Sequence, residues 1–198
     1  MTGSIRHAID TDAPAIQQIY APFVNDHVTS FEAVAPDTPE IARRMHEGAG
    51  RFPWLVYEHD GVVVGYAYAS PHSARSAYQW SANVSVYVAP SVHRRGIGRA
   101  LYTALLELLR RQRFANAYGG ITLPNPASVS LHESLGFVPV GIYRGVGFKF
   151  GEWRDVMWLH ARLRDDAEPA GPPLPVPSME DPDVRDLLHR CAQAVKGG

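Results

Sequence analysis

Two glycines and three arginines stand close together in the middle of the chain, and their spacing suits a phosphorylated ligand. Without Cβ atoms, Gly96 and Gly98 let the backbone come close to a pyrophosphate. The apolar-periodic stretch that follows predicts a helix whose free N–H groups and positive dipole end face that anion. Nearby guanidinium groups can add charge-assisted hydrogen bonds, from Arg94, Arg95 and Arg99. Solubilising charges at an ordinary helix start are the alternative interpretation of the arginines.

A second group of polar residues lies downstream of this turn. A predicted strand from Tyr118 to Leu123 ends at Asn125, and a short helix begins at Pro126. That helix carries His132, a residue type whose ordinary pKa of about 6.5 allows it to give or accept a proton at neutral pH. A histidine that only makes local hydrogen bonds is the alternative. Two other phosphate motifs are excluded, because there is no third glycine at dinucleotide-fold spacing and no P-loop Gly-Lys-Ser/Thr.

The elements around these residues follow from the apolar spacing. Residues 78–88 alternate like a strand with one buried face, which places Asn83, Ser85 and Tyr87 together on the other face unless a bulge intervenes. An Asp-Gly pair at 60–61 between apolar runs predicts a hairpin. Thr38 followed by proline predicts the N-cap of a second helix. The pattern as a whole predicts a mixed α/β or α+β chain.

Composition narrows the class of protein. The 198 residues carry a net charge of -1, which argues against a general nucleic-acid or membrane surface. A single cysteine, Cys191, excludes an internal disulfide and fits a reducing cytosol. No signal peptide or apolar span of membrane length is present, so we expect a cytoplasmic protein without membrane partners. No metal site is expected, because no metal-ligand spacing joins the remaining histidines, which we interpret as surface or locally satisfied residues: His7, His27, His46, His59, His72 and His160.

The chain divides into a body and a tail. We expect one domain over residues 1–165, a proline-rich linker over 166–182 and an amphipathic helix or tail over 183–198. Asp181 or Asp183 is placed to cap that helix. It would pack on the body or on a partner subunit; a frayed tail is the alternative. Its helically spaced apolar residues are Val184, Leu187, Leu188, Cys191 and Val195.

Several motifs, in order, resemble those of the GNAT N-acetyltransferase superfamily. They are HRRGIGRALYTALLELL after VSVYV, and LPNPASVSLHESLGF. Together with ARSAYQW and GFKFGEWRDVMW, they resemble the phosphinothricin and methionine sulfoximine acetyltransferase family from about Ile5 to Leu163. The resemblance implies the GNAT fold, with a central mixed, mostly antiparallel sheet flanked by helices. It also implies acetyl-CoA as co-substrate.

The same resemblance assigns a cofactor site. The strand before the glycine turn would donate backbone N–H groups to the pantetheine and thioester, from Val86, Tyr87 and Val88. Asn125 would bind the pantetheine amide, and Ser134 would lie in the same site. The pyrophosphate would be held by Arg94, Arg95, Gly96, Ile97, Gly98 and Arg99.

Two further positions concern the chemistry. In many GNAT enzymes a tyrosine at the position of His132 is proposed to protonate the leaving sulfur. Close phosphinothricin-detoxifying members carry a glutamate, proposed as the base for the acceptor amine, where this chain has Asn83. An asparagine amide does not ionise in this range. Either a water and His132 suffice, or the base is elsewhere, or the acceptor differs.

The resemblance also assigns an acceptor site. Arg75 and Tyr78 match residues that line it and receive the acceptor carboxylate, which suits the planar guanidinium fork. A lysine of the herbicide-resistance members is replaced by Ser73 here. Glu32 is equally consistent with a surface charge. We interpret three tryptophans as core residues rather than as parts of a binding site: Trp80, Trp153 and Trp158. The full expected acceptor set is Phe31, Glu32, Arg75, Ser76, Tyr78, Asn83 and Ser85.

These assignments lead to one hypothesis for function and two alternatives. We expect an acetyl-CoA-dependent N-acetyltransferase acting on a small amino acid or analogue, by direct attack in a ternary complex, in a protein that is a homodimer. The first alternative is another amine, such as a polyamine, an aminoglycoside or a protein N-terminus. The second is a non-catalytic acetyl-CoA-binding module.

Overall fold

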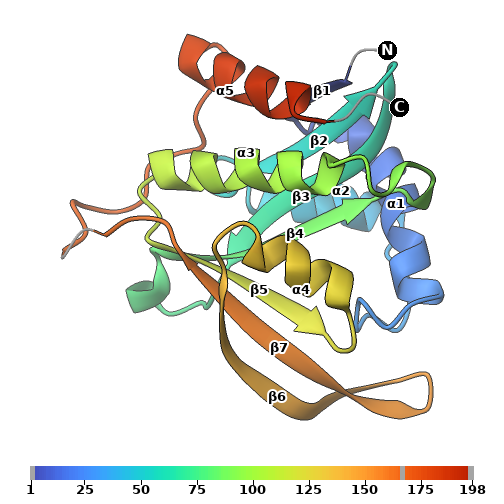
Figure 1. The fold of residues 1–198 in the computed structure, drawn as a ribbon. Coiled ribbons are helices and arrows are strands. Elements are labelled where there is room, and N and C mark those ends of the chain that lie inside the picture. The colour runs from blue at the N-terminus through green and yellow to red at the C-terminus, as the bar shows by residue number, and fades with distance from the viewer. Residues whose placement is uncertain (1–2, 166–167, 196–198) are drawn as a thin grey trace.

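The computed structural model describes residues 3–165 and 168–195 (Figure 1). Residues 166–167 of the expected linker and 196–198 of the expected tail lie outside the described residues. The strands are β1 (Gly3–His7), β2 (Trp54–His59), β3 (Val62–Pro71), β4 (Ser81–Val88), β5 (Asn116–Thr122), β6 (Val138–Lys149) and β7 (Glu152–Arg162). The α-helices are α1 (Ala13–Asn25), α2 (Thr38–Glu47), α3 (Ile97–Arg111), α4 (Pro126–Glu133) and α5 (Pro182–Gln193).

The described strands form one seven-stranded sheet in the order β1-β2-β3-β4-β5-β7-β6. Every neighbouring pair is antiparallel except β4 and β5, which run parallel. Parallel neighbours need a long crossover connection, and α3 supplies it. The predicted mixed, mostly antiparallel sheet flanked by helices is therefore confirmed.

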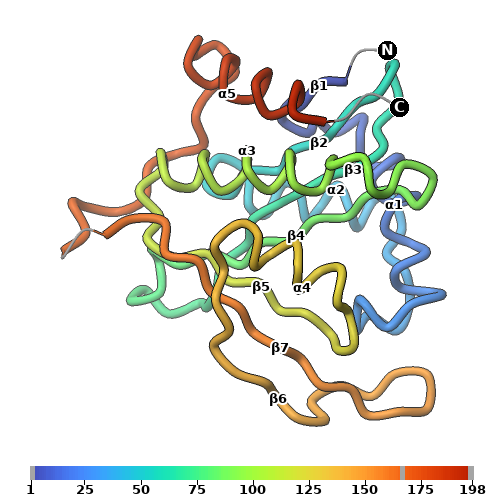
Figure 2. Tube along the Cα trace, in the orientation of Figure 1, coloured from blue at the N-terminus to red at the C-terminus, as the bar shows by residue number. Residues whose placement is uncertain are grey.

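Helices cover both faces of the sheet (Figures 1 and 2). On one face, the apolar stripe of α3 is fully buried against the sheet through Leu101, Leu105, Leu108 and Leu109. On the other face, α1 and α2 pack on Val56 and Tyr66. Because successive strand residues point to opposite faces, β2, β3 and β4 contribute side chains to both cores.

The two parallel strands separate before they end. β4 and β5 are paired only where Ser81, Ala82 and Asn83 face Asn116, Ala117 and Tyr118. Beyond Asn83 the rest of β4 has its ladder with β3 alone. A gap therefore opens between the two central strands, with polar backbone groups along its edge.

Local details differ from the sequence expectation at two points. The N-cap of α2 is Asp37, not Thr38, because the Asp37 carboxylate accepts a hydrogen bond from the Glu40 N–H at 2.9 Å and Thr38 is already helical. The central strand begins at Ser81 rather than Tyr78, since a short 3₁₀ turn occupies Ser76–Tyr78. No bulge interrupts the β3–β4 register, so the simple alternation along β4 holds.

The C-terminal helix packs on the body. α5 lies beside α3 and contacts β1 (Figures 1 and 2). Its N-cap is Asp181, whose carboxylate accepts a hydrogen bond from the Asp183 N–H. The proline-rich segment before it is extended and bonded to the body, since the Leu174 N–H donates to the Gln112 carbonyl at 2.7 Å. The buried residues of α5 are Val184, Leu187, Leu188, Cys191 and Ala192.

Candidate active site

The glycine turn places the start of α3 at the open end of the β4–β5 gap. Gly96 is the N-cap of α3 with φ of 90°, a left-handed conformation that glycine adopts without strain. The first intrahelical bond runs from the Ala100 N–H to the Gly96 carbonyl. The N–H groups of Ile97, Gly98 and Arg99 therefore have no partner within the helix. Ile97 is itself buried and anchors the turn, so these N–H groups have a fixed orientation of the kind that suits an anion.

The three arginines of the turn have different surroundings. Within the part of the chain that the structure describes, the guanidinium groups of Arg94 and Arg95 make no ion pair. Arg99 instead donates to Oγ of Ser134 at 2.7 Å and to its carbonyl at 3.3 Å. Arg99 and Ser134 thus connect the start of α3 to the end of α4, while Arg94 and Arg95 stay available to phosphates.

Alternate residues of β4 turn their backbone groups toward the gap. The Val84 carbonyl lies 3.3 Å from the Tyr102 hydroxyl oxygen, and the Val88 carbonyl accepts from Nε2 of His93 at 2.8 Å. Both carbonyls therefore point away from β3, and the alternation of a strand places the N–H and C=O of Val86 on the same side. The gap is lined by preorganised donors of the kind that stabilise negative charge on an oxygen.

Tyr87 lies differently from its neighbours in the predicted donor set. The Ala89 N–H bonds to Val64 of β3, so by parity the backbone of Tyr87 also faces β3 rather than the gap. Its ring packs on the opposite face of the sheet, 4.9 Å from the Tyr20 ring and 5.1 Å from the Phe23 ring. The backbone groups of Val86 and Val88 therefore face the gap. The backbone of Tyr87 faces β3, and its side chain packs in the core between the sheet and α1 and α2.

His132 is a buried side chain between α4, α3 and β5. Its Nδ1 lies 2.8 Å from the Ser128 carbonyl and its Nε2 lies 3.1 Å from the Tyr102 hydroxyl. A carbonyl only accepts, so Nδ1 carries the proton and Nε2 of the neutral ring accepts from Tyr102. Burial lowers the pKa of His132, which favours this neutral form. The ring lies against Gly119, where a Cβ atom would stand 2.6 Å from Nε2.

Asn125 closes the same face of the gap. Its Oδ1 caps α4 by accepting from the Ser128 N–H at 3.1 Å, which leaves its NH₂ group for a ligand carbonyl. A small pocket of about 60 Å³ lies in the gap. Its lining comes from both sides of the sheet, because Thr29 belongs to the α1–α2 connection and Tyr102 and His132 to the opposite helices. A thioester on one side and an amine on the other could meet here.

On the face that carries α1 and α2, Asn83 is held by two hydrogen bonds. Its Nδ2 donates to the Pro71 carbonyl at 3.2 Å, and its Oδ1 lies 2.9 Å from Nδ1 of His72. The His72 ring stacks on Tyr118 with centroids 4.3 Å apart. Sequence reasoning placed His72 among the surface histidines, and no linear motif marks it. The sequence feature that pointed toward His72 was Asn83 itself, because its amide does not ionise and a group that accepts a proton is then expected nearby.

The same face continues across β5 and β7. Trp158 covers Gly120, where a Cβ atom would lie 3.4 Å from the indole ring. The Trp158 indole N–H is buried and, within residues 3–165 and 168–195, has no hydrogen-bond partner. Ser85 of β4 lines the small pocket in the gap. Asn83, Ser85 and Trp158 thus surround the gap with side chains from two strands, β4 and β7.

The α1–α2 connection forms one wall of this face. The Phe31 ring lies against Gly147 of β6, where no side chain would fit. Lys149 fixes the connection by donating from Nζ to the Val24 carbonyl at 2.7 Å and to the Ser30 carbonyl at 2.6 Å. The β6–β7 hairpin is therefore attached to the connection that carries the expected acceptor residue Phe31.

Glu32 belongs to an internal network instead of standing as a free surface charge. Arg44 donates to both of its carboxylate oxygens, at 2.7 and 3.0 Å, and the Tyr20 hydroxyl donates at 2.8 Å. These hydrogen bonds, first that of Arg44, hold the pKa of Glu32 below its usual range. Glu32 therefore stays ionised and helps to hold the α1–α2 connection in place.

Arg75, Ser76 and Tyr78 lie in an exposed loop at the mouth of this face. Tyr78 is 44% exposed, and its ring lies 5.7 Å from that of His72. The Arg75 guanidinium makes no hydrogen bond or ion pair with any residue in the described ranges, and only its backbone N–H contacts Ser73. An unpaired cation at the mouth suits an anionic group of an acceptor.

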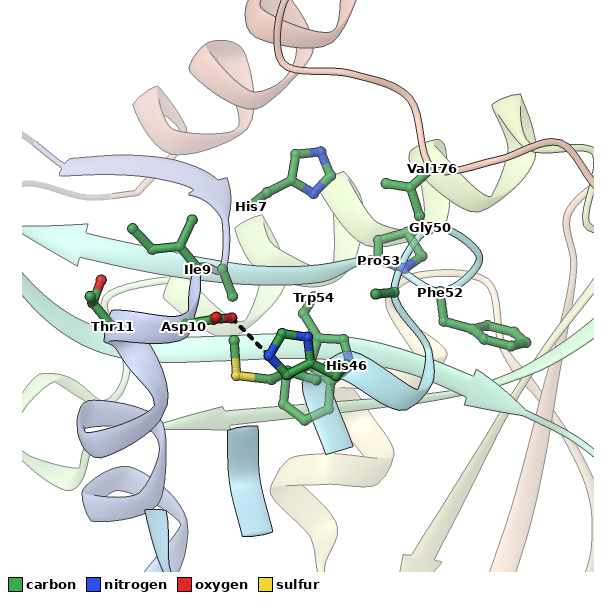
Figure 3. Close-up of a pocket in the computed structure, with 13 residues that line it drawn as sticks. His7, Ile9, Asp10, Thr11, His46, Gly50, Phe52, Pro53, Trp54 and Val176 are labelled. Atoms are coloured by element: carbon green, nitrogen blue, oxygen red, sulfur yellow. Dashed lines mark ion pairs between the residues drawn. The ribbon is translucent and has the colours of Figure 1, made fainter. Parts of the chain in front are cut away.

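Two larger pockets lie away from the gap. The first, about 600 Å³, lies between β1, the start of α1 and the end of α2 (Figure 3). It contains an ion pair of His46 with Asp10 at 3.2 Å, and Val176 of the tail lies at its edge. The second, about 530 Å³, opens between α2 and β3 and reaches Ser70, the register partner of Asn83. Only the second borders the face of the gap that carries Asn83.

Two further features are absent from the described residues. Across residues 3–165 and 168–195, no group of three or more histidine, cysteine, aspartate or glutamate side chains is arranged to hold a metal ion. Over the same ranges, no helix combines the length and apolar character needed to cross a membrane.

Comparison with known proteins gives a consistent result. The family model described as an acetyltransferase (GNAT) domain matches residues 5–158. A phosphinothricin N-acetyltransferase of Streptomyces viridochromogenes is 40% identical over 174 residues, covering 87% of this chain and 92% of that protein. An L-methionine sulfoximine/L-methionine sulfone acetyltransferase of Salmonella typhimurium is 34% identical over 171 residues, covering 84% of this chain and 98% of that protein.

A solved structure agrees in fold. The GNAT superfamily phosphinothricin acetyltransferase from Sinorhizobium meliloti, solved in complex with acetyl-CoA, superposes with a TM-score of 0.80 at 32% sequence identity. The match covers 87% of this chain and 94% of that one. The overall fold of this chain therefore also occurs in a protein solved in complex with acetyl-CoA.

Proposed function

Because this chain belongs to the GNAT acetyltransferase family and is an acetyl-CoA-dependent N-acetyltransferase, we propose that its acceptor is the amine of a small amino acid or amino-acid analogue. The relatives named for phosphinothricin and for methionine sulfoximine support this acceptor class. We further propose that the amine attacks the thioester directly in a ternary complex. Cys191, the single cysteine, is buried in α5 and so offers no acyl-carrying nucleophile at the gap.

The observation that carries this proposal is the β4–β5 gap, which is lined from both faces of the sheet. On the α3 face, the residues fit an acetyl-CoA molecule. Free N–H groups at the start of α3 and the unpaired Arg94 and Arg95 suit the pyrophosphate, and the Asn125 NH₂ suits the pantetheine amide. The bound co-substrate supplies the thioester whose acetyl group is transferred.

Two groups on the α3 face fit the transfer itself. The Val86 and Val88 N–H groups are aimed at the gap, where they would stabilise the thioester oxygen; such a donor is commonly worth about 2.7–4 kcal/mol. The Tyr102 hydroxyl, hydrogen-bonded to Nε2 of His132, would supply the proton for the leaving thiolate, and a proton from solvent, taken up at Nε2 of His132 and passed on to the phenolate, would replace it. His132 thus acts as proton relay through Tyr102 in this proposal, since its own N–H is held by Ser128.

On the opposite face, the groups fit an amino acid. The Arg75 guanidinium would receive the acceptor carboxylate in a bidentate pair. Tyr78, Phe31 and Ser85 would form the sides of the acceptor site, and Ser76 lies in the same loop. Asn83 can contact the acceptor only by hydrogen bonds, because its amide does not ionise.

The assembly and location are also proposals. We propose a homodimer, because the β6–β7 hairpin leaves a row of large apolar side chains exposed that a second copy would cover. The single cysteine supports a reducing cytosol. The exposed residues are Val138, Val140, Tyr143, Val146, Phe148, Phe150 and Trp153.

A panel assay tests the acceptor class. Thiol release from acetyl-CoA would be measured with phosphinothricin, methionine sulfoximine, methionine sulfone, ordinary amino acids, a polyamine and an aminoglycoside. We expect the highest kcat/KM with a carboxylate-bearing amine, and little with its decarboxylated analogue. Equal or faster reaction of the decarboxylated analogue would overturn the proposed acceptor class.

A further inference from the structure

An amino-acid acceptor reaches the gap mainly as an ammonium ion, since an α-amino group has a pKa of about 7.7 or higher. It must lose a proton before nitrogen can attack a carbonyl carbon. The residue of β4 nearest the start of the gap is Asn83, which accepts no proton at neutral pH. The base must therefore be another group on the acceptor face.

We propose that Nε2 of His72 is the general base that deprotonates the acceptor amine, and that Asn83 is the positioning residue that sets its tautomer. This inference rests on the proposed function. The Pro71 carbonyl can only accept, so the Asn83 amide must turn its NH₂ toward Pro71 and its Oδ1 toward His72. The Oδ1 in turn accepts, so Nδ1 of His72 carries the proton. Nε2 is left with its lone pair free.

The surroundings of His72 hold its ring at the acceptor face. It stacks on Tyr118 at 4.3 Å, meets Tyr78 at 5.7 Å and meets the edge of Trp158 at 6.1 Å. Asn83 and Tyr118 are the last paired residues before the gap. Ser85, which lines the gap, lies two residues further along β4, or about 7 Å. A water between Nε2 of His72 and the acceptor amine would carry the proton across that separation.

A second imidazole, that of His160, stacks on the same tyrosine and allows a comparison with His72. His160 also stacks on Tyr118, at 4.9 Å, but its Nε2 is bonded to Oδ1 of Asn116 at 3.0 Å. Nε2 of His72 makes no hydrogen bond with any residue in the described ranges, and it is not among the buried polar atoms without partners. Among the described residues both rings thus keep one nitrogen without a hydrogen bond, but His72 is bonded to Asn83, the last paired residue of β4 before the gap, whereas His160 is bonded to Asn116 at the far end of the paired segment.

The chemical step balances with this assignment. The acceptor ammonium gives a proton to Nε2 of His72, and the free amine nitrogen forms a bond to the acetyl carbonyl carbon. The carbon–sulfur bond breaks, and the thiolate gains the equivalent of the second proton that the nitrogen loses. His72 returns its proton to solvent, so one amide, one thiol and one proton are the products.

The test is the pH dependence of kcat/KM for His72→Gln, with the panel amine that the wild type acetylates fastest. Without the base, only amine that is already neutral in solution can react. We expect a loss of about 100-fold near pH 7 that shrinks about tenfold per pH unit toward the pKa of the amine. The titratable groups packed against His72 are Tyr78 and Tyr118, with His160 behind Tyr118 and Arg75 in the same loop.

Controls separate a base from a structural residue. His160→Gln removes the matched imidazole, and we expect its kcat/KM to stay within about threefold of wild type with an unchanged pH profile. Asn83→Ala keeps the base but frees its tautomer, so a loss of about tenfold with the wild-type profile is expected. The affinity of His72→Gln for acetyl-CoA, measured by calorimetry, should equal that of the wild type.

The contrary results are distinct. A His72→Gln enzyme within threefold of wild type, or one whose deficit is the same at every pH, would overturn the role of His72 while leaving the proposed function intact. If the wild type acetylates no carboxylate-bearing amine of the panel, the proposed function fails, and this inference fails with it.

Discussion

The two faces of the β4–β5 gap are built in different ways. The α3 face takes its groups from the end of β4 and from two contiguous segments, residues 94–102 and 125–134, and uses mostly backbone N–H groups. The α1 face gathers single side chains from the α1–α2 connection, the loop after β3 and the strands β4, β5 and β7. A ligand shared by a whole family can be bound by backbone, whereas acceptor choice depends on separate side chains that can change one at a time.

The sharpest way to test this difference uses two neighbouring glycines of β5. Gly119→Ala would place a Cβ atom 2.6 Å from Nε2 of His132 on the α3 face, and the buried ring has no room to retreat. We expect kcat/KM to fall about 100-fold or more because the Tyr102–His132 pair is displaced, with about 1–3 kcal/mol lost from the free energy of unfolding. Steady-state kinetics and urea denaturation measure both.

Gly120→Ala is the matched control on the other face. Its Cβ atom would meet the Trp158 ring at 3.4 Å, which a small shift accommodates. We expect the acetyl-CoA affinity to be unchanged, with any effect confined to KM for the acceptor. Equal losses in both variants would mean that the two faces are not separate.

The next largest effect is expected at the phosphate turn. Replacing Arg94 and Arg95 together by glutamine removes two unpaired cations, each worth about 1 kcal/mol toward a phosphate at an exposed site. KM for acetyl-CoA should rise about 30-fold and KM for the acceptor should stay constant. Arg111→Gln, at the far end of α3 and paired with Glu107, serves as control. An increase in both KM values to the same extent would contradict the separation of the faces.

A smaller effect is expected at the mouth of the acceptor face. Arg75→Ala should raise KM about tenfold for a carboxylate-bearing amine and leave KM for acetyl-CoA unchanged, because one bidentate pair is lost. The decarboxylated analogue should show no difference between variant and wild type. A tenfold loss with both amines would show that Arg75 does not contact the carboxylate.

The smallest effect concerns stability rather than rate. Burial lowers the pKa of His7, His132 and His160 in the folded protein, whereas an unfolded histidine titrates at about 6.5. Below about pH 6.5 the unfolded chain therefore binds more protons than the folded protein. The free energy of unfolding falls as the pH drops below that value, and the contribution of these histidines to stability is fully present above it. The Tm should be a few degrees lower at about pH 5.5 than at about pH 7.5.

His132→Gln provides the check on that dependence. Removing one buried neutral imidazole should reduce the difference in Tm between the two pH values, since glutamine does not titrate. A wild-type Tm that is equal at both pH values, or higher at the lower one, would contradict the assignment of neutral buried histidines.

The same division explains what the sequence could predict. The strand, glycine turn and helix over residues 84–111 are local patterns, so they are visible without a structure, as is the short helix that carries His132. His72 is different, because its contact with Asn83 depends on the β3–β4 register and on the Pro71 carbonyl. Such details are set by tertiary pairing. The Asp37 cap differs from the predicted Thr38 by a single residue, which short-range preferences do not resolve.

The most direct test of the account varies both substrates at once. Initial rates of thiol release would be measured across a grid of acetyl-CoA and acceptor concentrations, with the fastest amine of the panel. If the thioester and the amine meet in the gap from opposite faces, double-reciprocal lines must intersect, because both substrates are bound before any product leaves. Parallel lines would indicate an acetylated enzyme and would contradict direct transfer between the two faces.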